Sequence, residues 1–209
     1  MIAVLIAGAV AMALSLFGTR ALISFFDSIG KGQPILGSDD HGPVHHMKKQ
    51  GTATMGGIAI MVSAFIGWGA AHLRGGIALS DQAMIMWAIC GVLSVIGFLD
   101  DYLKVHRAQN RGIFWKKKGY ITFGLVVVMM TWLLLGTGVS ETLSFTRFDF
   151  PGWQLSPVLW VVWTSLMVWA TTNAVNVTDG LDGLAAGSAL FGFLAFTVIA
   201  YWAFRNPDI

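Results

Sequence analysis

Long stretches without any charged residue constrain the fold of this chain more than any other feature. Six runs contain no Asp, Glu, Lys or Arg: 1–19, 54–73, 82–99, 119–140, 150–178 and 183–204. An α-helix needs about 20 apolar residues to cross a bilayer. Charged residues make up only 11% of the sequence, against roughly 25% in a soluble domain. The runs therefore predict an all-α, polytopic membrane protein with six transmembrane helices.

The expected spans follow these runs closely. They lie at about 1–26, 54–73, 82–99, 119–137, 156–175 and 183–204, within one helical membrane domain over residues 1–209. The first run does not have the form of a cleaved signal, because no basic segment precedes it. Between the fourth and fifth spans, Phe145, Phe148 and Phe150 alternate with polar residues. This alternation predicts a short β-hairpin.

The distribution of positive charge predicts the orientation in the membrane. Basic residues gather in the loops after the first and third spans: Lys31, Lys48, Lys49, Lys104, Arg107, Arg111, Lys116, Lys117 and Lys118. The opposite loops carry Arg74 and Arg147. Because cytoplasmic loops carry the excess of Lys and Arg, the N-terminus is expected outside and the hairpin in the periplasm.

Two adjacent carboxylates, Asp100 and Asp101, follow the third run directly. In one interpretation they simply end the span in water. Two neighbouring acids at a helix C-terminus are unfavourable, however, because they oppose the helix dipole and repel each other. A divalent cation, or Lys104 one turn further on, would offset that repulsion. A Mg²⁺ ion held by carboxylates, together with lysines, binds phosphate oxygens, so metal or proton chemistry is the alternative.

A polar segment, residues 173–185, separates the fifth and sixth runs and carries two carboxylates and two carboxamides. Asp182 could simply cap the following helix, with the neighbouring glycines in the turn. That interpretation leaves Asn176 and Asp179 unexplained. Amides and carboxylates in such a segment can bind the edge of a nucleobase. In the predicted orientation this segment is cytoplasmic, like the paired carboxylates.

The segment 45–57 leads into the second run and combines two lysines with three glycines. Glycine permits close backbone approach, a threonine could cap the helix, and a helix N-terminus beside lysine attracts phosphate. A flexible basic loop is the alternative. His41, His45 and His46 do not have the spacing of a usual zinc site, and no cysteine accompanies them.

Three motifs occur in order along the chain: HMKKQGTATMGG at 46–57, GFLDDYLK at 97–104 and NAVNVTDGLDGLAAG at 173–187. Together they resemble the phospho-N-acetylmuramoyl-pentapeptide transferases, within the polyprenyl-phosphate hexosamine-phosphate transferase superfamily. The spacer GIFWKKK at 112–118 is similar to the segment that follows the aspartate pair in this family. The resemblance extends from about residue 20 to the end of the chain.

The resemblance implies transfer of phospho-N-acetylmuramoyl-pentapeptide from its UDP conjugate to undecaprenyl phosphate, with Mg²⁺. The products would be UMP and the first lipid-linked peptidoglycan precursor, at the cytoplasmic face of the bacterial inner membrane. Asp100 would orient or deprotonate the lipid phosphate, and Asp101 would support the metal. The implied substrate-binding residues are His46, Lys49, Thr54, Lys104, Lys118, Asn176, Asp179, Gly180, Leu181 and Asp182. A homodimer is also expected, and no nucleic acid partner.

The sequence departs from the family pattern in two ways. Ala53 stands where the family usually has proline, which loosens the start of the helix. The family also has about ten spans, and its later loops carry a third, magnesium-binding aspartate and a histidine-rich motif. We therefore expect this chain to be the N-terminal part of such an enzyme and to be inactive alone. UMP release by purified residues 1–209 would contradict that expectation.

Two other functions are weighed against this interpretation. One is a related transferase that uses UDP-N-acetylglucosamine with a polyprenyl phosphate. The TDGLDGLA and KKxGTxTMGG forms of the motifs favour the muramoyl-pentapeptide enzyme. The other is a membrane transporter, because intramembrane Asp and Asn can build an ion pathway. A transporter predicts acids along both membrane faces, whereas the candidate acids here gather on one.

Overall fold

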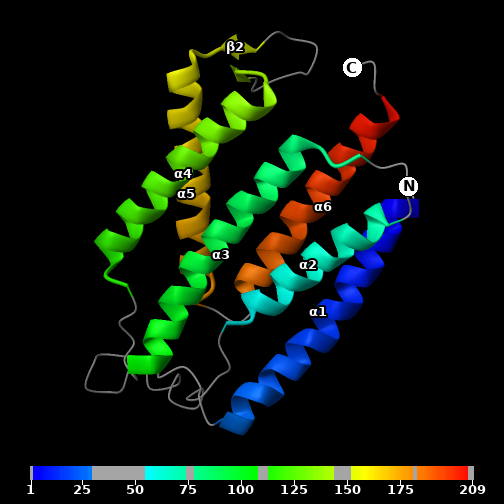
Figure 1. The fold of residues 1–209 in the computed structure, drawn as a ribbon, viewed down its shortest axis with the longest axis vertical. Coiled ribbons are helices and arrows are strands. Elements are labelled where there is room, and N and C mark those ends of the chain that lie inside the picture. The colour runs from blue at the N-terminus through cyan, green and yellow to red at the C-terminus, as the bar shows by residue number, and fades with distance from the viewer. Residues whose placement is uncertain are drawn as a thin grey trace. The chain divides into compact units, whose positions relative to one another are not determined.

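The computed structural model describes residues 2–29, 55–73, 78–107, 113–143, 152–180 and 183–206. Within them the chain forms helices and one pair of short strands (Figure 1). The helices are α1 (Ile2–Ile29), α2 (Gly57–His72), α3 (Asp81–Arg107), α4 (Trp115–Thr137), α5 (Pro157–Thr178) and α6 (Leu184–Arg205). The strands are β1 (Thr142–Leu143) and β2 (Trp153–Gln154). The predicted all-α architecture is confirmed.

Five of the described helices are long and apolar enough to cross a membrane. The exception is α2, whose 16 residues cover about 24 Å at 1.5 Å per residue, against a hydrocarbon core of about 30 Å. The helix predicted at 54–73 is therefore shorter than the uncharged run that contains it. The helices make this a multi-pass membrane protein.

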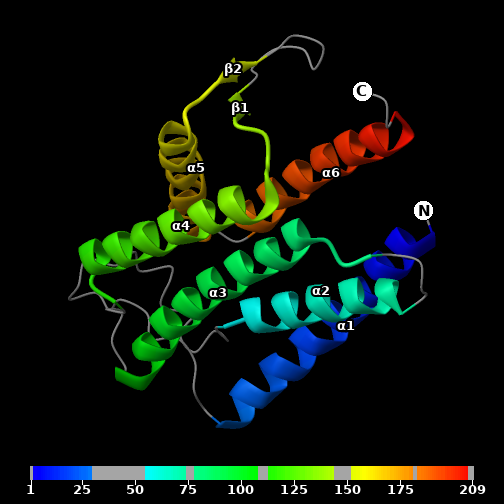
Figure 2. The same ribbon diagram turned by 45° about the horizontal axis from the view of Figure 1, so that its top comes forward.

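The predicted hairpin between the fourth and fifth helices is confirmed. β1 and β2 pair antiparallel, with Thr142 opposite Gln154 and Leu143 opposite Trp153 (Figure 2). The three phenylalanines on which the prediction rested lie outside the described residues. The strand pair connects the end of α4 to the start of α5.

The chain divides into two compact units. Met1–Thr122 contains α1, α2, α3 and the first turns of α4, and Phe123–Ile209 contains the rest of α4, the strand pair, α5 and α6. The paired carboxylates belong to the first unit and the polar segment at the end of α5 to the second. The single domain expected over residues 1–209 stays a prediction.

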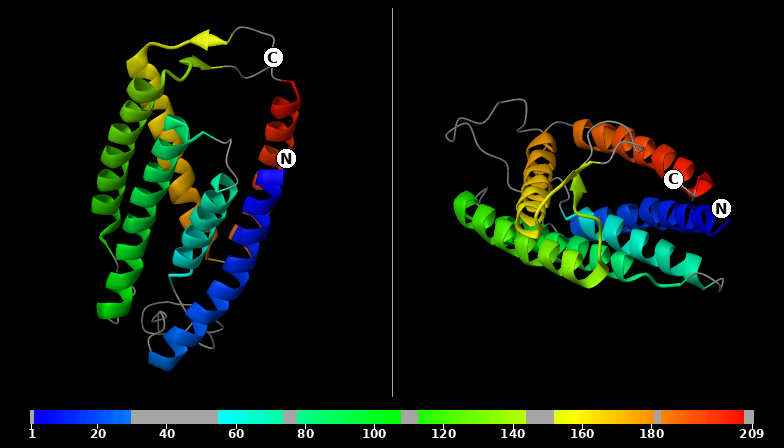
Figure 3. Two further views of the ribbon diagram at one scale, coloured as in Figure 1. Left: turned by 45° about the vertical axis from the view of Figure 1, so that its right-hand side comes forward. Right: turned by 90° about the horizontal axis from the view of Figure 1, so that it is seen from above.

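In the first unit, α1 and α2 pack side by side in opposite directions (Figure 3). Small side chains permit the close approach, since Ser63, Gly67 and Ala71 form a buried stripe along α2. A Cβ added to Gly67 would lie 2.5 Å from the carbonyl oxygen of Ala7 and 2.8 Å from the Cβ of Ala11. This spacing of small residues is typical of helix pairs in membranes. A side chain at Gly67 would force the two helices apart.

The third helix does not end at the paired carboxylates, where a helix end was expected, and the span predicted at 82–99 stays a prediction. α3 continues through Asp100 and Asp101 to Arg107, about two turns further. The carboxylates are therefore not at the helix C-terminus, where the dipole would disfavour them. Lysines from α3 and α4 neutralise them instead, so the helix continues.

The turn between α5 and α6 also differs from expectation. α5 extends to Thr178, whereas the span was predicted to end at 175. Gly183 occupies the N-cap position of α6 with φ 77°, a left-handed conformation that favours glycine. Asp182 therefore does not hold that position, and it lies outside the described residues. α6 has no buried residue within the described part of the chain.

Candidate active site

A buried carboxylate at Asp100 forms the centre of the candidate active site. Its side chain is 7% exposed, and its Oδ1 accepts a hydrogen bond from the backbone N–H of Ile113 at 2.8 Å. Its Oδ2 accepts from Nζ of Lys118 at 2.9 Å and lies 3.0 Å from Nζ of Lys104. Two ammonium groups and one backbone donor therefore stabilise the ionised carboxylate.

Asp101 is the more open of the two acids. Its side chain is 34% exposed, and Nζ of Lys104 donates to its Oδ1 at 3.0 Å. Lys104 follows the two acids at spacings of four and three, which places all three side chains on neighbouring positions of the helix surface. One lysine therefore bridges both carboxylates and offsets their mutual repulsion.

Lys118 brings the start of α4 to Asp100. It lies in the first turn of α4 with Lys116 and Lys117, where the positive end of the helix dipole disfavours cations. The negative charge of the Asp100 carboxylate offsets this unfavourable placement of Lys118. The ion pair joins residues 18 positions apart, so it ties α4 to α3. The hydrogen bond from the N–H of Ile113, two residues before α4, is a second contact with the same carboxylate.

Of the two acids, Asp101 has the more exposed carboxylate, which could share a metal ion with a substrate. Within the described ranges, no group of three or more His, Cys, Asp and Glu side chains could hold a metal ion. Magnesium is commonly bound through one or two carboxylates, with phosphate and water oxygens as the remaining ligands. Asp101 could be such a ligand, whereas both oxygens of Asp100 already accept from Lys104, Lys118 and the N–H of Ile113.

In the second unit, the polar residues at the end of α5 have a different arrangement. The side chains of Asn173 and Thr178 each donate to the carbonyl four residues earlier, at 2.7 Å. The side chains of Asn176 and Asp179 are exposed and form no hydrogen bond or ion pair with a described residue. Gly180 follows them in the turn and is also exposed. This end of α5 is thus open to a ligand.

Several predicted substrate-binding residues lie outside the described part of the chain: His46, Lys49, Thr54, Leu181 and Asp182. Their positions and roles stay predictions. The N-cap position of α2 is held by Gly56, and no side chain caps it. The threonine cap considered for this helix is therefore not found at that position.

The contacts of Lys118 and Ile113 with Asp100 were not predicted. The motifs assigned Lys104 and Lys118 to substrate phosphates, whereas the structure shows both ammonium groups on the carboxylate of Asp100. Three lysines in the first turn of a helix are a signal that an acid lies nearby. The N–H of Ile113 gives no comparable signal, because every residue except proline carries that donor.

Comparison with known proteins places this arrangement in a family. The profile of glycosyl transferase family 4 matches residues 82–208, more than half of the 209 residues. The matched range contains the paired carboxylates, both lysines that contact them and the polar end of α5. Both polar regions thus lie within the matched range.

Similar proteins extend the match over 97% of the chain. The phospho-N-acetylmuramoyl-pentapeptide-transferase of Frankia alni is 35% identical, and the match covers 58% of that protein. The transferases of the same name from Streptomyces griseus and Streptomyces avermitilis are 35% and 36% identical, with 57% of each covered. The chain thus spans less than two thirds of these relatives. The resemblance carried by the motifs is confirmed, and the chain belongs to glycosyl transferase family 4.

Proposed function

We propose that the full-length protein transfers phospho-N-acetylmuramoyl-pentapeptide from its UDP conjugate to undecaprenyl phosphate. The products are the first lipid-linked peptidoglycan precursor and UMP. The observation that carries the proposal is the Asp100 carboxylate, held between Lys104 and Lys118 on a membrane helix. Phosphoryl transfer depends on placing acids and cations around phosphate groups in this way. The names of the similar proteins support the choice of substrate.

In the proposed reaction, a phosphate oxygen of the lipid attacks the phosphorus that carries the sugar. A new P–O bond forms, the P–O bond to the UMP phosphate breaks, and UMP leaves with the electron pair. Asp100 orients the lipid phosphate or accepts its proton. Lys104 and Lys118 face the phosphate charge. Because an ammonium group has three N–H donors, each lysine can bind phosphate while it keeps its contact with Asp100.

Asp100 and Asp101 are proposed to hold Mg²⁺ together with the substrate. The ion would neutralise charge on the diphosphate, which is where a divalent cation accelerates such a transfer. Chelation of divalent ions should therefore stop turnover by the full-length protein, and added Mg²⁺ should restore it. Turnover that continues in excess chelator would contradict the proposed cofactor.

The end of α5 is proposed to bind the uridine end of the donor. The exposed amide of Asn176 can donate to and accept from groups of the nucleotide, and the exposed carboxylate of Asp179 can accept from its N–H or O–H groups. Gly180 allows the backbone to approach the ligand closely. The remaining proposed contacts are with Leu181, Asp182, Lys49, His46 and Thr54.

Turnover by the full-length protein tests the proposed function directly. With Mg²⁺, undecaprenyl phosphate and the UDP-muramoyl-pentapeptide, we expect UMP release and transfer of the sugar to lipid. A preference for UDP-N-acetylglucosamine in the same assay would contradict the proposed substrate and favour the related transferase. A protein that binds no uridine nucleotide would favour transport or a structural role instead.

We also propose a homodimer in the bacterial cytoplasmic membrane, with the N-terminus outside and the active site on the cytoplasmic face. The positive charge after the first and third helices supports this orientation. A cysteine introduced at exposed Lys117 should react with an impermeant thiol reagent only after permeabilisation. Labelling in intact cells would contradict the orientation, and a monomeric mass in mild detergent would contradict the dimer.

A further inference from the structure

The ammonium group of Lys104 lies between the two carboxylates of the candidate active site. Its Nζ is 3.0 Å from Oδ2 of Asp100 and 3.0 Å from Oδ1 of Asp101. Lys104 follows the acids by four and three residues, so one helical turn brings the three side chains together. One cation thus contacts an oxygen of each carboxylate, which is how a bridging metal ion would use the pair.

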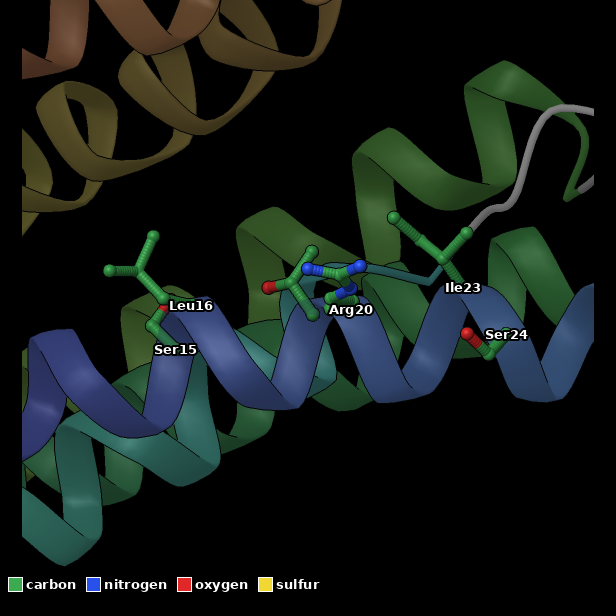
Figure 4. Close-up of a pocket in the computed structure, with 6 residues that line it drawn as sticks. Ser15, Leu16, Arg20, Ile23 and Ser24 are labelled. Carbon is green, nitrogen blue, oxygen red and sulfur yellow. The ribbon is translucent and has the colours of Figure 1, made fainter.

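Lys104 differs in its surroundings from a cation elsewhere in the described helices. Arg20 lies on an exposed face of α1, in a shallow hollow lined by serine, threonine, leucine and isoleucine side chains of the same helix (Figure 4). The side chain of Lys104 is 20% exposed, and its charged neighbours are carboxylates. Because water reaches Lys104 poorly, its ammonium group can leave the carboxylates only for another anion.

The cluster around Asp100 has no charge left to attract a metal ion. Lys118 contacts the same Oδ2 at 2.9 Å, and the N–H of Ile113 donates to Oδ1. Two carboxylates and two ammonium groups therefore give the cluster no net charge. Both ammonium groups would also repel a divalent ion at short range. The substrate-free arrangement thus disfavours a metal ion between Asp100 and Asp101.

A substrate phosphate would change this balance. The diphosphate of the proposed donor brings negative charge that attracts a divalent ion and offers a new partner to an ammonium group. Lys104 carries its charge on a flexible four-carbon stem, so it can turn towards a phosphate without movement of α3. Lys118 and the N–H of Ile113 would keep Asp100 in place during this exchange.

We propose that Lys104 excludes a divalent ion from Asp100 and Asp101 until a substrate phosphate binds the lysine. The ion then takes the position between the carboxylates, and Lys104 neutralises the phosphate. Metal ion and substrate therefore bind cooperatively, and by linkage each raises the affinity for the other by the same factor. The identities of the phosphate and of the metal ion rest on the proposed function.

Binding of Mn²⁺ to the full-length protein without substrate tests the role of Lys104. Mn²⁺ binds to the same oxygen ligands as Mg²⁺, and electron paramagnetic resonance measures its free concentration. We expect Lys104→Met to raise the Mn²⁺ affinity about tenfold over the wild type, because the competing cation is gone. Lys104→Arg keeps a positive charge at this position and should stay within about twofold of the wild type. An unchanged affinity in Lys104→Met would overturn the proposal.

A matched control removes a neighbouring lysine. Lys117→Met deletes an exposed positive charge next to Lys118 and should change the Mn²⁺ affinity by less than about twofold. A gain as large as that of Lys104→Met would show that net charge, rather than the position of Lys104, controls metal binding.

A double variant locates the ion. Asp101→Asn in the Lys104→Met background should abolish the gain in Mn²⁺ affinity, because the opened position loses one of its carboxylates. A gain that survives this change would place the ion elsewhere and overturn the proposal. If Lys104→Met does not fold, Lys118→Met decides the question. It also removes a cation from Asp100, so an unchanged Mn²⁺ affinity in that variant would contradict the proposal.

Cooperativity is tested with the UDP substrate in the absence of the lipid acceptor. Calorimetry gives its dissociation constant with and without Mg²⁺, and the ratio of the two values measures the coupling. We expect a ratio several-fold larger for the wild type than for Lys104→Met, and equal ratios would contradict the proposal. The Mn²⁺ measurement uses no substrate, so its result is independent of UMP release. Absence of UMP release by the wild type would contradict the proposed function alone.

Discussion

The two polar regions of the chain differ in how their side chains are satisfied. Asp100 is buried, and its own chain supplies every hydrogen bond described for it. Asn176 and Asp179 are exposed and have no such partner among the described residues. The first region is therefore organised before substrate arrives, whereas the second is completed by a ligand. Substitutions around Asp100 should lower turnover and the free energy of unfolding. Substitutions at Asn176 or Asp179 should lower only the affinity for the UDP substrate.

The largest effect is expected at Asp100. Asp100→Asn keeps the shape of the side chain but removes the charge that orients or deprotonates the acceptor. Turnover by the full-length protein should fall by about 10²–10⁴-fold, measured as UMP release. The same change at exposed Asp81, in the first turn of α3, is the control and should leave turnover unchanged. Comparable loss in both variants would show that Asp100 has no special role.

The ion pair between α3 and α4 is expected to have the next largest effect. Lys118→Met removes a hydrogen-bonded cation from Asp100 and should lower the free energy of unfolding by about 1–3 kcal/mol. Lys117→Met, on an exposed neighbour, should stay within about 0.5 kcal/mol of the wild type. Denaturant unfolding in detergent measures both. Equal stability of the two variants would mean that the first region is not organised by this pair.

Substitution of Asp179 should change the affinity for the UDP substrate but not the stability, the opposite of Lys118→Met. Asp179→Asn removes a charge that faces solvent, so the thermal midpoint should not change. The dissociation constant for the UDP substrate should rise about tenfold, because a charged hydrogen bond to the ligand is lost. Asp27→Asn, at the exposed end of α1, is a control for loss of a surface carboxylate. A clear drop in thermal midpoint for Asp179→Asn would erase the distinction between the two regions.

The smallest effect is expected from the backbone donor on Asp100. Ile113→Pro removes the N–H that bonds to Oδ1, at a cost of about 0.5–1.5 kcal/mol, or a few-fold in turnover. Ile113→Ala shortens the side chain but keeps the N–H, so it isolates the contribution of the bond. If alanine lowers turnover as much as proline, the side chain rather than the hydrogen bond is responsible.

Local sequence features predicted the helices well because charge is excluded from hydrocarbon. Each uncharged run overlaps one helix along most of its length, and the run at 82–99 also showed the limit of that rule. α3 continues past Asp100, because partners elsewhere in the chain neutralise it. A carboxylate therefore need not end a helix when lysines neutralise its charge. The partner Lys118 is 18 residues away, beyond the reach of local patterns.

Packing between helices was equally hard to predict. Small residues four apart occur at Ser63, Gly67 and Ala71, and again at Gly183 and Gly187. Only the first set is buried against another helix, whereas a Cβ on Gly187 would meet no atom within 4 Å in the described part of the chain. The pattern permits close packing, but the opposing surface decides whether it occurs.

In the proposed reaction, Asp100 performs chemistry while the end of α5 holds the nucleotide. The decisive measurement is the dissociation constant of the UDP-muramoyl-pentapeptide for full-length Asp100→Asn. It is made by calorimetry without the lipid acceptor and without divalent ions, so that loss of a metal ligand does not affect the value. We expect a value within about twofold of the wild type, in a variant whose UMP release has fallen by about 10²–10⁴-fold. A loss of affinity as large as that of Asp179→Asn would show that Asp100 binds the nucleotide substrate, against the proposed division of roles.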